Sequence, residues 1–482
     1  MQALRPYPAY RESGVPWLGK VPAHWEVRRL RTVAEMRVSN VDKLTNENEY
    51  AVSLCNYTDV YNNDRIRAGM DFMKATATAD EIERFRLRSG DVLITKDSEA
   101  WDDIGVPALV ESTEDELISG YHLALLRPES KQILGAYLHY AISCAGVADQ
   151  FHVGANGVTR FGLTQNAIKS VWLPLASLPE QAAIVRFLDH TDRHIRRYIR
   201  VKEKLIALLE EQRRAVIHQA VTGQIDVRTG RPYSSRKPSG VKWLGHVPAH
   251  WERRRLKSLL RPIDSRSITG EETLLSLRRD HGVVIYAEHF ARPPQGSTHI
   301  GFKLVAVGHL VVNRLQANNG LVFRAGISGL VSPDYSVFEA TQTFSMQYLS
   351  DLLRTVGYRA HFRQHAKGLG TGTSGFLRLY DDEFLATTVF LPPEQEQVSI
   401  LRALAKNRVE TLKRIKKQEG QLRFISEYRT RLIADVITGK LDVREAVAEL
   451  PEEPGEPEGG DDGRSDRDRR TAVPTTQEET TP

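Results

Sequence analysis

The sequence is poor in cysteine and contains no long apolar run. Two cysteines, Cys55 and Cys144, occur among 482 residues, which is too few for a disulfide framework or a cysteine-based metal site. No stretch of about 18 apolar residues is present. The first residues also lack the apolar segment of a signal peptide. We therefore expect a soluble, cytoplasmic protein without a membrane partner.

The length and the charge balance predict several domains and a polyanionic partner. A chain of 482 residues is too long for one hydrophobic core, so two or three domains are expected. Residues 451–482 hold ten acidic and four basic residues, which leaves a net charge of +11 on the first 450 residues. A basic body suggests nucleic acid as a partner. The acidic, Pro- and Gly-rich end cannot form a core and is predicted to be disordered.

An internal repeat organises the rest of the chain. Residues 13–30 and 239–256 are identical at fifteen of eighteen positions, at an offset of 226. Further pairs follow in the same order: GDVLITK and GHLVVNR, GVTR and GFLR, LPEQ and PPEQ, VTGQIDVR and ITGKLDVR. Most of the sequence between these pairs differs. The repeat therefore predicts a duplicated scaffold that carries two divergent regions.

Each half of the repeat predicts a mixed α/β region followed by one long helix. Short aliphatic runs predict strands, and longer amphipathic runs predict helices. The predicted strands lie at 91–95, 108–110, 303–307 and 309–312, and the predicted shorter helices at 133–145 and 349–365. The long helices follow proline-rich corners, occupy residues 180–220 and about 394–437, and end at a Thr-Gly pair.

The two long helices are predicted to form an antiparallel coiled coil within the chain. Glycine and proline are absent from residues 180–220, and Gly420 is the one glycine of the second helix. Apolar residues recur at heptad spacing, which is typical of a coiled-coil seam. The predicted seams are Ile184, Leu188, Thr191, Ile195, Tyr198, Lys202, Leu205, Leu209, Gln212 and Val216, and Leu401, Leu404, Ile415, Leu422, Ile425, Leu432 and Val436. The alternative is that each helix packs on its own domain or on another subunit.

The repeated motifs resemble those of the specificity subunits of type I restriction–modification systems. They are WLGxVPAHWE at Trp17–Glu26 and Trp243–Glu252, PEQ before each long helix, and TGxhDVR after it, where h is apolar. The resemblance covers about residues 10–445. It implies two target-recognition domains that read the halves of a split DNA site. Because the two divergent regions differ, we expect an asymmetric target.

The resemblance also implies the partners and the domain plan. Double-stranded DNA and two adenine methyltransferase subunits would bind directly, and restriction–translocase subunits would join through the methyltransferase. The fold class is α/β with internal duplication, in which two target-recognition domains are joined by the two long helices. The expected segments are recognition domains at 1–178 and 223–392 (with a basic linker at 228–238), spacer helices at 179–222 and 393–440, and an acidic disordered tail at 441–482.

Two pairs of loops are candidate DNA contacts. The first pair follows GDVLITK and GHLVVNR, and its Arg, Asn and Gln side chains match the edges of guanine and adenine. The second pair is glycine-rich and allows close approach to phosphates. The candidates are Lys96, Arg314, Gln316, Asn318 and Asn319 in the first pair, and Asn156, Thr159, Arg160, Thr371, Thr373, Ser374 and Arg378 in the second. The alternative for both pairs is an ordinary solvated connection.

Catalytic and cofactor-binding motifs are missing from the sequence. It has no Asn/Asp-Pro-Pro-Tyr/Phe methylation motif, no GxxxxGK[ST] loop and no PD-(D/E)xK constellation. His361 and His365 have the spacing of helical metal ligands but no evident third ligand, so no metal is predicted. We therefore expect a non-catalytic protein without a cofactor. The alternatives are a self-contained nuclease or methyltransferase with an unfamiliar site, or a purely structural scaffold.

Overall fold

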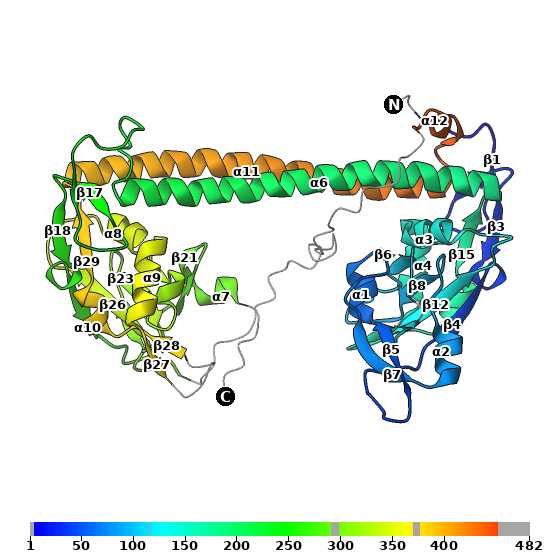
Figure 1. The fold of residues 1–482 in the computed structure, drawn as a ribbon, viewed down its shortest axis with the longest axis horizontal. Helices are drawn as coiled ribbons and strands as arrows, with labels where there is room; N and C mark the ends of the chain where they lie inside the picture. Colours follow the sequence, from blue (N-terminus) through cyan, green and yellow to red (C-terminus); the bar gives the residue numbers. More distant parts are fainter. Residues whose placement is uncertain (1–3, 115, 291–297, 370–375, 452–482) are drawn as a thin grey trace. The chain divides into compact units, whose positions relative to one another are not determined.

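A computed structural model describes residues 4–114, 116–290, 298–369 and 376–451 (Figure 1). The chain divides into two compact units: unit 1 spans residues 1–201 and 421–482, and unit 2 spans residues 202–420. Each unit is mixed α/β and takes one part of helix α6 (Leu178–Val221) and one part of helix α11 (Glu394–Ile437). Among the described residues, no helix combines the length and apolar character needed to cross a bilayer.

The core of unit 1 is a five-stranded sheet in the order β4-β12-β8-β10-β6. Its strands are β4 (Ala34–Val38), β6 (Arg65–Ile66), β8 (Val92–Thr95), β10 (Pro107–Val110) and β12 (Leu123–Pro128). Every residue of β8 is buried, because helix α3 contacts this part of the sheet and apolar side chains from several other elements pack around it. The strands predicted at 91–95 and 108–110 correspond to β8 and β10.

The core of unit 2 is a four-stranded sheet in the order β19-β26-β23-β24. Its strands are β19 (Leu260–Ile263), β23 (Leu310–Asn313), β24 (Val322–Arg324) and β26 (Tyr335–Ala340). Strand β6 lies at the edge of the unit 1 sheet and pairs parallel to β10. The other four strands of unit 1, β4-β12-β8-β10, and the four strands of unit 2 share one order, in which the first, fourth, second and third along the chain lie side by side and neighbours are antiparallel. The same strand order therefore underlies the two divergent regions.

The remaining elements surround these two sheets. Those of unit 1 are β1 (Tyr10–Glu12), β2 (Lys20–Pro22), β3 (Glu26–Arg29), η1 (Leu30–Thr32), β5 (Tyr50–Cys55), α1 (Tyr57–Asn62), β7 (Met73–Ala77), α2 (Ala79–Phe85), β9 (Asp97–Ser98), β11 (Leu117–Ser119), α3 (Gly135–Ser143), α4 (Ala145–Gly154), β13 (Ala155–Gly157), β14 (Phe161–Leu163), α5 (Gln165–Ser170), β15 (Trp172–Leu175) and α12 (Arg444–Ala448). Those of unit 2 are β16 (Arg236–Pro238), β17 (His246–Pro248), β18 (Glu252–Arg255), η2 (Leu256–Ser258), β20 (Leu275–Arg278), β21 (Gly282–Ile285), α7 (Tyr286–His289), β22 (Lys303–Val305), η3 (Ala317–Asn319), β25 (Gly329–Val331), α8 (Met346–Leu353), α9 (Val356–His365), β27 (Lys367–Leu369), β28 (Phe376–Arg378), α10 (Asp381–Ala386) and β29 (Thr388–Leu391).

Two expectations about the smaller elements need correction. The helix predicted at 349–365 is two helices, α8 and α9, and between them Thr355 Oγ1 donates to the carbonyl of Leu352 at 2.8 Å. Part of the tail predicted to be disordered forms helix α12, because the buried side chains of Val443 and Val447 anchor it to the core of unit 1. The rest of that predicted tail, from residue 452, lies outside the described residues.

Within each unit, α6 and α11 pack against each other. In unit 2 the Lys202 ammonium donates to the side chain of Gln418 at 2.9 Å, while Ala220 shares a core cluster with Ile400 and Leu404. Higher numbers on one helix therefore face lower numbers on the other, so the two segments run antiparallel. In unit 1, the Arg429 guanidinium donates to Asp192.

Three of the ten predicted seam residues of α6, Tyr198, Leu205 and Gln212, are exposed. Ile195 and Leu209 are buried as predicted, but Tyr198 and Leu205 are exposed by 41% and 38%. Ile199 is buried in place of Tyr198. An α-helix has 3.6 residues per turn, so a sequence with apolar residues at both i+3 and i+4 leaves the packed face open. The apolar spacing within α6 therefore does not decide whether Tyr198 or Ile199 faces the partner helix.

The repeated PAHWE segments bind both long helices in the same way. In unit 1, Glu180 near the start of α6 accepts a hydrogen bond from Tyr7 Oη at 2.7 Å and lies 3.0 Å from His24 Nε2. Pro22 of the same segment lies against Gly439, at the end of α11. The motif therefore joins the start of one long helix to the end of the other.

Unit 2 repeats this junction with the roles of the helices exchanged. Glu396 near the start of α11 accepts from Tyr233 Oη at 2.6 Å and lies 2.7 Å from His250 Nε2. Pro248 lies against Gly223, at the end of α6. Tyr233 belongs to the segment expected to be a basic linker, so that segment is part of the folded junction.

The glycine at this junction supports a stability prediction. Gly223 has φ +69°, and a Cβ there would collide with Pro248. Gly223→Ala should therefore lower the free energy of unfolding by about 1–3 kcal/mol. Gly420→Ala is the matched control, since nothing surrounds that position within 4 Å, and an alanine inside a helix should stabilise by about 0.5–1 kcal/mol. Thermal unfolding of both variants tests the assignment, and equal melting temperatures would contradict it.

Candidate functional site

The two candidate loops of unit 1 meet at the end of β8. The backbone N–H of Leu163 donates to the carbonyl of Lys96 at 2.8 Å, next to the pairing of β9 with β14. The Lys96 ammonium contacts the Asp97 carboxylate at 3.3 Å. His122 Nδ1 lies 2.9 Å from the same carboxylate and 3.4 Å from the guanidinium of Arg160. The sequence candidates Lys96 and Arg160 are thus brought together through two residues that sequence reasoning missed.

An exposed aromatic ring completes this cluster. Tyr121 is exposed by 49%, the Lys96 ammonium lies 4.7 Å from its ring centroid, and the ring meets His122 edge-on. We name Lys96, Asp97, Tyr121, His122 and Arg160 site 1. With a neutral histidine, site 1 carries two cations and one carboxylate, which gives it a net positive charge suited to a polyanion.

Unit 2 has a corresponding cluster at the end of β23. The guanidinium of Arg314 donates to the carbonyls of Asp334 and Pro333 at 2.6 and 3.1 Å. Arg378 forms an ion pair with the Asp334 carboxylate at 2.6 Å, and its guanidinium lies 5.9 Å from the ring centroid of Tyr380. We name Arg314, Asp334, Arg378 and Tyr380 site 2. It also combines two cations, one carboxylate and a tyrosine.

The strand registers show which positions of the two sites are equivalent. Extending the antiparallel registers by one residue places His122 opposite Lys96 and Asp334 opposite Arg314. The backbone N–H of Leu379 donates to the carbonyl of Arg314 at 2.9 Å, as Leu163 does to Lys96. Lys96 therefore corresponds to Arg314, and His122 corresponds to Asp334.

The same registers correct the matching of GVTR with GFLR. Because Leu163 corresponds to Leu379, Arg378 corresponds to Gly162 and lies two positions from the equivalent of Arg160. The two arginines therefore reach their clusters from different points of the hairpin. Arg378 also has a structural role in its ion pair with Asp334, which the sequence did not reveal.

The other candidate residues lie around these sites. In unit 1, Asn156 and Thr159 are exposed, and the Asn156 amide donates to the carbonyl of Gly154 at 3.0 Å. In unit 2, the side chain of Asn319 donates to that of Gln316. Asn318 lies in η3, and its carbonyl accepts from Arg359 at 3.1 Å. The candidates outside the described residues are Thr371, Thr373 and Ser374.

Sequence reasoning missed Tyr121, His122, Asp334 and Tyr380 because cross-strand pairing is not visible in one sequence. The available signal was weak: a polar residue directly precedes β12 and β26. The histidine pair that was considered for a metal stays within one helix, where His365 Nδ1 lies 2.9 Å from the carbonyl of His361. In the described part of the chain, no three His, Cys, Asp or Glu residues group as metal ligands.

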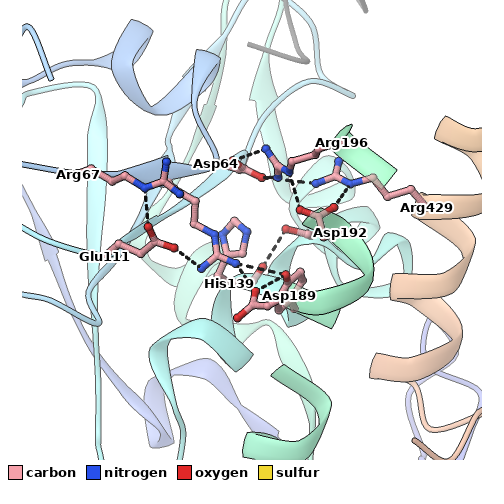
Figure 2. A network of polar contacts seen from close by, with 11 residues as sticks. Asp64, Arg67, Glu111, His139, Asp189, Asp192, Arg196 and Arg429 are labelled. Atoms are coloured by element: carbon pink, nitrogen blue, oxygen red, sulfur yellow. Dashed lines mark hydrogen bonds and ion pairs between the residues drawn. The ribbon is translucent and has the colours of Figure 1, made fainter. Parts of the chain in front are cut away.

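A network of buried charges attaches the unit 1 sheet to the long helices (Figure 2). Arg196 of α6 contacts both Asp64 and Asp192, and Arg429 of α11 reaches the same two carboxylates. Burial by itself would raise the pKa of Asp64, but Arg196 and Arg429 outweigh it and hold that pKa well below its ordinary value. The carboxylate is therefore ionised across the neutral range.

A second part of the network starts from the adjacent residue on β6. Arg65 forms an ion pair with Asp189 of α6 at 2.6 Å and with Glu111 at 3.2 Å. Tyr140 Oη of α3 donates to the same Asp189 oxygen at 2.6 Å. Asp64, directly before β6, and Arg65, its first residue, are thus two adjacent and oppositely charged anchors, which fix the position and direction of this strand on the helix.

Comparisons with known proteins agree with the motifs. Residues 22–208 match the family described as "Type I restriction modification DNA specificity domain". A Methanocaldococcus jannaschii protein, named for the specificity subunit of the MjaX type I restriction enzyme, is 23% identical over 236 residues, which are 49% of this chain and 52% of that protein. The chain thus matches about half the length of this curated relative.

Solved structures share the fold. A chain from a structure reported as the basis of complex assembly and conformational transition of the type I R-M system has a TM-score of 0.61 at 14% identity, covering 87% of this chain and 99% of its own. The HsdS subunit from Thermoanaerobacter tengcongensis has a TM-score of 0.46 at 15% identity, with 87% and 98% coverage. The first of these likenesses shows a common fold.

The charge network leads to a prediction about acid stability. Because the pKa of Asp64 is lowered by folding, its contribution is complete above the unfolded-state pKa of about 4 and is lost as the pH falls toward the folded value. Asp64→Asn should cost about 3 kcal/mol at neutral pH, since it leaves the arginines without their buried partner. It should also weaken the acid dependence of unfolding, measured as melting temperature against pH.

A surface ion pair provides the control for Asp64→Asn. Glu12 and Lys20 lie 3.7 Å apart, with side chains exposed by 76% and 69%. Glu12→Gln should change the stability by less than about 0.5 kcal/mol. If Asp64→Asn behaved like Glu12→Gln at neutral pH, the network would not hold unit 1 on its helices.

Proposed function

We propose that the chain is the DNA-reading specificity subunit of a type I restriction–modification complex, and the match of residues 22–208 to the family described as "Type I restriction modification DNA specificity domain" supports this. The observation that carries the proposal is the pair of sites 1 and 2. They occupy equivalent strand ends in sheets that share an order of four strands, yet they present different side chains. A duplicated frame with two different charged surfaces suits a protein that reads two different half-sites.

We propose that each unit contributes one target-recognition domain. The domains comprise residues 1–178 and 223–392, and residues 179–222 and 393–440 are the helices that set the distance between them. The equivalent junctions at Glu180 and Glu396 support this plan, because each fixes a recognition domain to both helices in the same manner. Different half-sites on such a frame make the DNA target asymmetric and split.

We assign the candidate residues different roles in DNA binding, according to whether their side chains are exposed or already hydrogen-bonded within the protein. Arg160 is exposed and positively charged, so we assign it to a phosphate or a base edge. Arg314 is held by two backbone carbonyls, so it orders its loop while its remaining N–H groups stay available to DNA. Asn318 and Gln316 are assigned to base edges at site 2.

The outer faces of the long helices suit protein partners. In unit 2, Leu208, Val409 and Leu412 are exposed by 51%, 67% and 42%, and in unit 1 Val201 and Phe424 are exposed by 59% and 70%. Apolar side chains gathered on a helix surface favour a protein interface. We propose that two adenine methyltransferase subunits bind here and that restriction–translocase subunits join through them. On this proposal the chain itself is non-catalytic, needs no cofactor and works in the cytoplasm.

Reconstitution tests this function. The purified chain alone should transfer no labelled methyl group from S-adenosylmethionine to duplex DNA, and adding the methyltransferase subunits should give transfer at a split target. Val409→Glu with Leu412→Glu should weaken the assembly at least about tenfold by placing charges in an apolar contact. Lys413→Gln on the same turn is the control and should bind normally. Methyl transfer by the chain alone would support the rival, a self-contained enzyme.

A further inference from the structure

We propose that His122 is the specificity-determining residue of site 1 and that it reads a base bearing an exocyclic amino group, adenine or cytosine, through its Nε2 atom. This inference rests on the proposed function and assigns the reading of one base to a single atom, Nε2 of His122. It starts from the position of the ring, whose Nδ1 lies 2.9 Å from a carboxylate oxygen of Asp97 while the side chain remains exposed by 34%.

The Asp97 carboxylate decides which tautomer the neutral ring adopts. Nδ1 has two polar neighbours, the Asp97 oxygen at 2.9 Å and the guanidinium of Arg160 at 3.4 Å, and a guanidinium can only donate. The shorter contact decides, because an unprotonated Nδ1 would place its lone pair against a negatively charged oxygen at 2.9 Å, so the Arg160 contact is not a hydrogen bond in this tautomer. The proton therefore sits on Nδ1, where it is donated to Asp97, and Nε2 keeps its lone pair. Among the described residues, Nε2 has no hydrogen-bond partner. The neutral ring thus presents a fixed acceptor at the surface of site 1.

The surroundings of the ring favour an approach to DNA. Lys96 and Arg160 place two positive charges beside His122, and Tyr121 covers one edge of it. Asp97 supplies the one negative charge among these neighbours, and its carboxylate already contacts the Lys96 ammonium and the His122 ring. The two cations attract the phosphate backbone of DNA. The Nε2 acceptor would then pair with a hydrogen-bond donor on the edge of a base. In the major groove, the amino groups of adenine and cytosine are the donors that base edges offer.

Protonation reverses the hydrogen-bonding character of this atom. A doubly protonated ring donates from Nε2 as well as from Nδ1, so it matches the acceptors of guanine and thymine and rejects an amino group. At the equivalent position of site 2, Asp334 is already engaged by Arg378. An ionised carboxylate has no proton to donate and is an acceptor only. Only the half-site read by unit 1 should therefore change its base preference with pH.

The test is selection of binding sites from random duplex DNA by the complex of the full chain with its methyltransferase subunits. The selections are run at about pH 8 and about pH 5.5. The wild type should prefer adenine or cytosine at one position of one half-site at the higher pH, and that preference should fall about tenfold at the lower pH. His122→Gln, whose amide does not titrate, should give the same preference at both pH values. The other half-site serves as the folding control and should be selected equally in all four experiments.

Each outcome separates this inference from the proposed function. If a split sequence is selected but neither pH nor His122→Gln alters one of its halves, the role of His122 is overturned and the specificity function stands. If the wild type selects no split sequence at either pH, the proposed function fails instead. If both halves respond to pH alike, the response is general and His122 does not determine it.

Discussion

The fold depends on a buried glutamate near the start of each long helix. Glu180 and Glu396 each accept from a tyrosine hydroxyl and lie against a histidine of the PAHWE segment. The proline of that segment fills the space over the glycine that ends the other long helix. Three segments far apart in the sequence therefore meet at one point in each unit. This requirement explains why these motifs are repeated while the sequence between them diverges.

Two kinds of polar interaction do different work in this protein. The network of Asp64, Arg196, Asp192 and Arg429 is largely buried and joins the unit 1 sheet to the helices. Its charges satisfy one another and are not available to a ligand. The clusters at sites 1 and 2 lie at strand ends and keep part of their side chains exposed. Their charges are only partly compensated, which leaves a net positive surface at each site.

The sequence predicted the parts of the fold that depend on local pattern. The approximate bounds of α6 and α11 and the strands β8 and β23 followed from spacing, and the repeated motifs indicated the resemblance to the family that residues 22–208 match. Features set by packing were not predictable in the same way. The shift from Tyr198 to Ile199 in the seam depends on which face meets the partner helix. The pairing that places His122 opposite Lys96 depends on strand register, which one sequence does not contain.

The central claim is that the recognition domains choose the bases and the helices choose the gap. The most direct test removes one heptad from each helix at facing positions, residues 202–208 and residues 412–418, which Lys202 and Gln418 place opposite one another. The helices would shorten by about 10 Å, or about three base pairs of DNA. Mapping methylated adenines made by the reassembled complex should then show both half-sites unchanged and a shorter gap between them. A change in the recognised bases at an unchanged gap would contradict the account.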